Sequence, residues 1–158
     1  MELKEIMAAF GVETGLTGLE PDAEGGVHLD IDDMTVSFVE ETETGRLLTW
    51  AEVGEPPPEG KDLLNRILLE AMFPGRESGE AVFSLDRESG KLHLHRHDAL
   101  ALMDLDGFKA MLEGFVNALE TWKNTIADFR KAAPDIWNAK NESDAVSRTL
   151  ERGDFMRV

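Results

Sequence analysis

The first periodic feature of the chain is an apolar stripe close to its start. Its residues recur at the spacing i, i+3, i+4 and i+7, which places them on one face of an α-helix. They are Leu3, Ile6, Met7 and Phe10. Gly11 follows them, and glycine is suited to ending a helix in the left-handed conformation. The pattern therefore predicts a short amphipathic helix over residues 3–10.

Alternation of apolar and polar residues follows, which is typical of half-buried β-strands. It covers residues 27–31 and 34–38, and only Asp32 and Asp33 separate the two runs. Two aspartates in this position favour a hairpin turn over a carboxylate site. Residues 46–53 carry apolar side chains on both faces, which indicates a central strand of the same sheet.

A second helix is predicted over residues 63–73, after an extended stretch with prolines at 56–58. Its apolar residues cover about half of the helical circumference or more, so the helix needs cover on two sides. One sheet in a domain of this size covers only one of them. The second cover is most simply another copy of the chain, and we expect a homodimer.

Two more alternating runs, residues 80–85 and 91–95, predict a hairpin around the turn-rich residues 86–90. A long helix should begin near Asp104, a good N-cap residue, and apolar residues then recur at steps of three and four as far as Phe129. Beyond Pro134 the pattern weakens. We expect residues 1–133 to form the folded domain and residues 134–158 to form a tail with at most a short helix.

This order of elements, α-β-β-β-α-β-β-α, predicts an α+β fold. It contains a bent antiparallel sheet of about five strands and three main helices.

Composition narrows the range of possible functions. The chain of 158 residues has 32 acidic and 16 basic residues and a net charge of −16, so it repels nucleic acids and anionic membranes. It has no cysteine, which excludes disulfides and thiolate sites. No leader or membrane-spanning run is visible, and we expect a cytoplasmic protein.

The patterns resemble the class I type III secretion chaperone family of bacteria, which is Tir chaperone-like. The resemblance covers roughly residues 1–130. It is carried by the apolar stripe of residues 3–10, VHLDIDDMTVSF (27–38), LLTWAEVG (47–54), LLNRILLEAMF (63–73), AVFSLDRESGKLHLH (81–95) and LDGFKAMLEGFVNALETWKNTI (105–126). Two features depart from the family: Phe73-Pro74-Gly75 replaces the usual polar residue after the second helix, and the tail is longer.

The resemblance implies a non-catalytic homodimer without a cofactor. Such a dimer binds the extended N-terminal segment of a secreted effector and keeps it soluble and export-competent. The residues implied to bind this partner are Leu3, Ile6, Met7, Phe10, Val36 and Phe38. The residues implied to form the dimer interface are Leu64, Leu68 and Met72. For each of these residues the alternative is ordinary core packing.

His93, His95 and His97 occupy every second position and should lie on one face of a strand, opposite Leu92 and Leu94. The first and last are roughly 13 Å apart at Cα, too far to share one zinc ion. At most two neighbours could chelate, with further ligands such as His28 and Asp30 brought from another strand. A solvated or partner-facing surface is the expectation, and imidazoles in so acidic a protein can also gain protons near neutral pH.

Enzymatic motifs are missing from the sequence. It has no glycine-rich phosphate loop, no GxSxG nucleophile turn and no tyrosine. Two alternatives to a secretion chaperone stay open at this point. One is an adaptor or sensory module of the same fold with no role in secretion, and the other is a histidine-dependent metal-binding protein.

Overall fold

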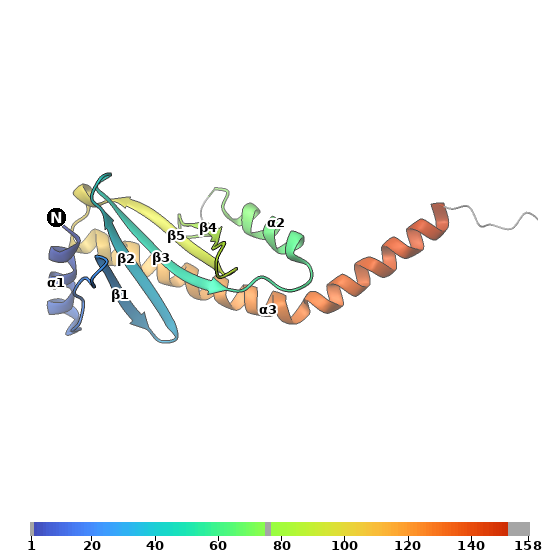
Figure 1. Ribbon diagram of the computed structural model, residues 1–158, viewed down its shortest axis with the longest axis horizontal. Helices are drawn as coiled ribbons and strands as arrows, with labels where there is room; N and C mark the ends of the chain where they lie inside the picture. The colour runs from blue at the N-terminus through green and yellow to red at the C-terminus, as the bar shows by residue number, and fades with distance from the viewer. Residues whose placement is uncertain (1, 75–76, 152–158) are drawn as a thin grey trace, which may run out of the picture.

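The computed structural model describes residues 2–74 and 77–151, with side chains described at 2–74 and 77–135 (Figure 1). Its elements follow the predicted order, and the α+β prediction is confirmed. They are α1 (Leu3–Thr14), β1 (Gly26–Ile31), β2 (Met34–Glu41), β3 (Arg46–Gly54), α2 (Lys61–Ala71), β4 (Val82–Leu85), β5 (Leu92–Ala99), the 3-10 turn η1 (Leu100–Leu102) and α3 (Leu105–Glu151).

The sheet has five antiparallel strands in the order β1-β2-β3-β5-β4. β3 lies in the middle, as its apolar residues on both faces predicted. Asp32 and Asp33 form the tight turn between β1 and β2, because Ile31 pairs directly with Met34. Asp32 has a φ of 52°, a left-handed conformation that aspartate adopts more readily than most residues. β1 and β4 are the two edge strands.

The core lies between the sheet and α3, which crosses one face of the sheet (Figure 1). Phe108 of α3 is fully buried, and its ring centroid lies 5.4 Å from that of Phe10 on α1 and 5.5 Å from that of Phe38 on β2. Edge-on and tilted contacts of this kind are favourable for aromatic rings. One side chain of α3 therefore joins the long helix to both α1 and the sheet.

α1 is longer than predicted. It continues through Gly11 and ends at Gly15, which has a φ of 74°. Gly11 meets a different demand: a Cβ atom added there would lie 2.9 Å from the carbonyl oxygen of Leu16. The chain after α1 folds back over the helix at this point, so glycine is needed for close approach and not for ending the helix.

α3 also runs past its predicted end. It includes Pro134 and continues to Glu151, so the described residues after Pro134 continue the long helix, where a tail with at most a short helix was expected. Proline removes one backbone donor without ending a helix outright, and Figure 1 shows that α3 changes direction along its length. Ala133 is still buried. Beyond it, the helix projects away from the sheet. Within the described chain no helix has the length and apolar character needed to cross a membrane.

Candidate functional site

The residues predicted to bind a partner all lie inside the subunit. Leu3, Ile6, Met7, Phe10, Val36 and Phe38 have exposed fractions between 0% and 8%. The apolar face of α1 packs on α3 and the sheet, and the two β2 residues point into the same core. The structure therefore favours the alternative that these side chains are core residues, and any partner surface near α1 must use their exposed neighbours.

Such neighbours are Val12, on the opposite side of α1, and Leu16, just after the end of the helix. Val12 is 87% exposed and Leu16 is 44% exposed. Val12, Ala8 and residues 15–21 border a hollow of about 550 Å³. Of the predicted partner-binding residues only Met7 lines this hollow, because Val12 lies outside the apolar stripe and the following segment is rich in glycine.

The residues predicted to form the dimer interface are also turned towards their own subunit. Leu64 and Leu68 are buried, and Met72 is half-buried with its sulfur accepting a hydrogen bond from the backbone N–H of Phe83 at 3.3 Å. This face of α2 covers the edge of the protein's own sheet. The sheet edge is thus the first of the two covers that the apolar circumference of α2 requires.

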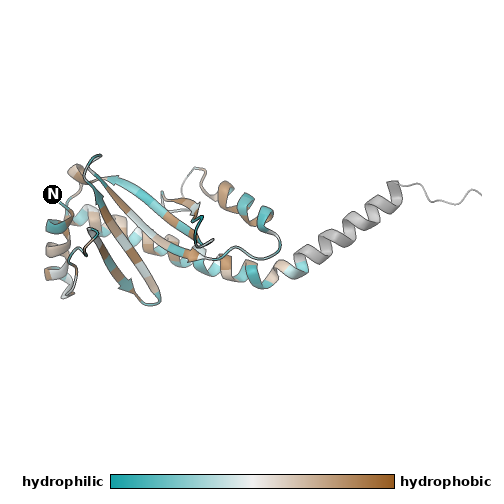
Figure 2. Ribbon diagram, in the orientation of Figure 1, coloured by the Kyte–Doolittle hydropathy of each residue, from teal (hydrophilic) through white to brown (hydrophobic). Residues whose placement is uncertain are grey.

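Away from this buried face, α2 also exposes apolar side chains. Leu69 is 64% exposed and Phe73, just after the helix, is 86% exposed. Beside them the edge strand β4 exposes Leu85, at 59%, which lines one hollow together with Leu69. Val82 lies on the other face of the strand, opposed to His95. Figure 2 shows hydrophobic positions on α2 and along the neighbouring strands. We call Leu69, Phe73 and Leu85 the α2/β4 surface, which has no cover among the residues that the structure describes.

The histidines lie where the alternation predicted. Leu92 and Leu94 are buried against the core, and His93, His95 and His97 point to the opposite, outer face of the sheet. The rings of Trp50 and His93 meet edge to face at 5.6 Å. Among the residues that the structure describes, no group of three or more histidine, aspartate or glutamate side chains is arranged to hold a metal ion.

His95 is held in its neutral form by its surroundings. Partial burial lowers its pKa below the ordinary value of 6.5, and the neighbouring His97 and His93 lower it further by charge repulsion. The folded state therefore binds this proton less readily than the unfolded chain does. Protonation of His95 therefore destabilises the folded state. Above about pH 6.5 the folded state keeps the full stability that neutral His95 allows, and this stability decreases as the pH falls below that value.

A histidine NMR titration tests this arrangement. We expect the His95 imidazole to titrate below pH 6.5, because burial opposes its charge. His97→Gln should raise the midpoint only partly, since it removes one repelling neighbour and leaves the burial in place. A midpoint at or above 6.5 in the wild-type protein would contradict the burial and ring geometry described above.

Comparison with known proteins identifies the family of this chain. The sequence pattern of the Tir chaperone protein (CesT) family matches residues 5–123, well over half of the chain. The chain belongs to the CesT family. The predicted resemblance to class I type III secretion chaperones is thereby confirmed. A comparison with curated protein sequences gives no match.

Solved structures agree with this CesT-family assignment. A chain of the ExsC–ExsE complex is 26% identical, with a TM-score of 0.67 over 80% of this chain and 97% of that chain. A chain of the complex between the Yersinia pestis type III secretion chaperone SycH and a stable fragment of YscM2 is 20% identical, with a TM-score of 0.59 over 77% and 99%. A chain of the ExoT–SpcS complex from Pseudomonas aeruginosa is also 20% identical, with a TM-score of 0.55 over 75% and 94%. The last two show a shared fold.

Proposed function

We propose that this CesT-family protein is a homodimeric, cytoplasmic chaperone of type III secretion. It binds the extended N-terminal segment of an effector and keeps it soluble and ready for export, without catalysing a reaction. The observation that carries the proposal is the family match over residues 5–123. Similar chains come from complexes described as chaperone with effector, or as chaperone with a protein fragment, which supports a protein client.

The exposed side of α1 is the proposed client surface. Val12 and Leu16 offer apolar area to an unfolded segment at the hollow described above. β1 lies at the same end of the molecule and is an edge strand, paired only with β2 (Figure 1). An extended client can add to such an edge through backbone hydrogen bonds while its side chains fill neighbouring pockets. Residues 1–133 are proposed as the chaperone domain and residues 134–158 as an appended segment.

Val12→Asp tests the client surface. We expect capture of the client to weaken about tenfold, because burying a valine side chain contributes about 1.5 kcal/mol and the aspartate opposes burial. The thermal midpoint should not change, since Val12 is 87% exposed in the subunit. The measurement is quantitative pull-down from cells that carry the gene, using tagged wild-type and variant proteins.

Ala127→Asp is the matched control, because it introduces the same charge at an exposed position of α3, far along the chain from α1. It should capture the client as well as the wild-type protein does. Equal capture by Val12→Asp and wild type would remove the hollow at α1 from the client surface. The buried Ile6 is unsuitable for this test, because a charge at that position would unfold the packing of α1.

A further inference from the structure

All 4 histidines of the chain lie on the outer face of the sheet. His28, Ser37, Trp50 and His95 occupy directly opposed positions on β1, β2, β3 and β5, so their side chains share one face. His93 and His97 share it through the alternation along β5. α3 covers the other face, and Figure 1 shows no helix over this one within the described part of the chain. The outer face is therefore an open platform that crosses the sheet.

A hollow of about 430 Å³ lies on this platform over β3, β5 and β4. Its walls are mostly rings and aliphatic carbon, with Ser84 and Asp86 at one side. Ser84 Oγ lies 3.2 Å from Nδ1 of His95, and the rings of His95 and His97 meet at right angles with centroids 5.8 Å apart. The hollow is lined by, among others, Leu48, Trp50, Asp86, His93 and His95.

One carboxylate lines this hollow and two more lie beside its histidines. Asp86 lines it and has a lowered pKa, mainly because the Ser89 hydroxyl and the backbone of residues 88 and 89 donate hydrogen bonds to it. Glu41 reaches His97 at 3.3 Å, and Glu52 lies opposite His93 in the sheet register. The cation closest to Glu52 is Lys91, whose ammonium group is already 2.9 Å from that carboxylate. At neutral pH the hollow is thus aromatic at its floor, with Asp86 and Glu41 as the negative charges at its rim.

We infer that this hollow binds an arginine side chain in an extended segment of the client. The inference rests on the proposed chaperone function. A guanidinium group stacks on tryptophan and histidine rings and pairs with carboxylates through several donors at once, which the compact lysine ammonium does less well. Anionic partners are opposed by the rim, and the whole chain carries a net charge of −16, which attracts basic segments.

A pair of synthetic peptides tests the inference without knowledge of the client. One is Ac-Ala-Val-Arg-Val-Ala-amide, and its twin carries citrulline, which keeps the shape of arginine and removes its charge. Binding to the full-length protein is followed by NMR at 150 mM salt, through the indole N–H of Trp50 and the imidazoles of His93 and His95. We expect saturable shifts with the arginine peptide and at least fivefold weaker binding of the citrulline peptide.

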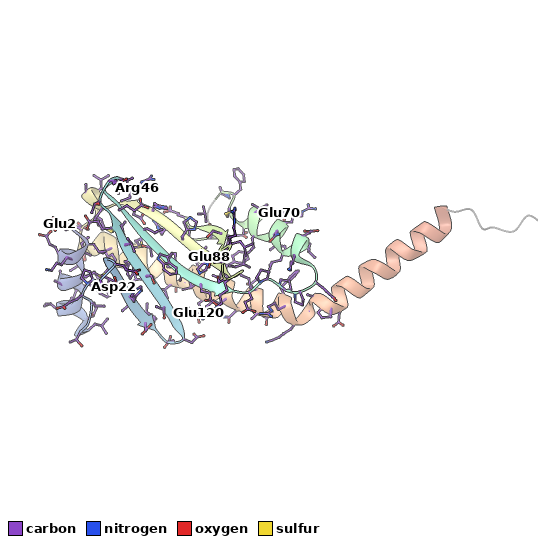
Figure 3. The ribbon with its side chains drawn as sticks, in the orientation of Figure 1. Glu2, Asp22, Arg46, Glu70, Glu88 and Glu120 are labelled. Atoms are coloured by element: carbon purple, nitrogen blue, oxygen red, sulfur yellow. The ribbon has the colours of Figure 1, made fainter. Side chains whose placement is uncertain are left out.

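Variants locate the site. Trp50→Leu removes the ring from a partly exposed position, and Asp86→Asn removes a rim charge. Each should weaken binding of the arginine peptide about threefold or more, with the His93 and His95 signals reporting on the site in both variants. Glu120→Gln, on the exposed side of α3, makes the same charge change away from the platform and should bind like wild type (Figure 3).

Two results would overturn the inference: no shift of the platform signals with the arginine peptide, or equal binding of both peptides. Either result would leave the capture experiment with Val12→Asp unaffected. That experiment uses the whole client and tests the surface at α1, not the outer face of the sheet. Conversely, failure to capture a client would count against the proposed function while the peptide result stood by itself.

Discussion

Leu69→Glu is expected to convert the protein from a dimer to a monomer. Leu69 is 64% exposed on the side of α2 that its own subunit leaves uncovered, and it lies in the α2/β4 surface with Phe73 and Leu85. A glutamate there must enter an apolar interface without a partner, which costs about 3–5 kcal/mol. That cost corresponds to a loss of dimer affinity of about a hundredfold or more. Light scattering on the eluting protein at micromolar concentration measures the mass directly.

Two further variants make this result specific. Leu102→Glu places the same charge at a residue that is 89% exposed but lies between β5 and α3, and it should remain dimeric. Leu68→Glu, only one position away from Leu69, places the charge at a residue that is 4% exposed and should unfold the subunit. If Leu69→Glu stays a dimer of undiminished affinity, the interface lies on another surface.

Phe108→Ala should lower the free energy of unfolding by about 3–5 kcal/mol. Its side chain is completely buried and contacts the rings of both Phe10 and Phe38, so truncation leaves a cavity where α3, α1 and the sheet meet. The packing around a buried ring relaxes only partly. Urea denaturation followed by circular dichroism measures the change.

The comparison is best made in the Leu69→Glu background, because the stability of a dimer depends on protein concentration. Phe73→Ala is the control there. It removes the same ring from a position that is 86% exposed, and it should change the stability of the subunit by about 0.5 kcal/mol or less. A loss of less than about 1 kcal/mol for Phe108→Ala would mean that α1 is not anchored through this residue.

Alternating patterns predicted the sheet well. On β5 the sequence alone separated Leu92 and Leu94 from His93 and His95, because successive side chains of a strand must point to opposite faces. The turn at Asp32 and Asp33 was equally clear, since the alternation stops on one side of it and resumes on the other. The direction of strand side chains and the position of a tight turn both depend on residues close together in the sequence, so the sequence alone predicts them.

The surfaces were harder to predict, because a core and a binding groove both require apolar residues. The stripe that includes Ile6 and Phe10 is the same for either role, and only the packing of α3 against it shows that it is core. On α2 the two sides differ in a similar way. Leu64 and Leu69 lie about 140° apart around the helix, and the wheel alone does not show which of them meets the protein's own sheet.

Helix ends depend on contacts that sequence does not show. Gly11 looked like the end of α1, yet its lack of a side chain serves the close approach of Leu16, and Gly15 ends the helix. Pro134 likewise looked like the end of α3. Proline excludes one hydrogen bond but leaves the rest of a helix able to continue, as α3 does to Glu151.

We propose that a dimer of this chain holds the N-terminal segment of a client. The most direct measurement is native mass spectrometry of the purified complex after limited proteolysis, which gives the number of copies of each chain and identifies the protected part of the client. We expect two copies of this protein with one protected fragment from the N-terminal part of the client. A single copy in the complex, or protection of only a folded domain elsewhere in the client, would contradict it.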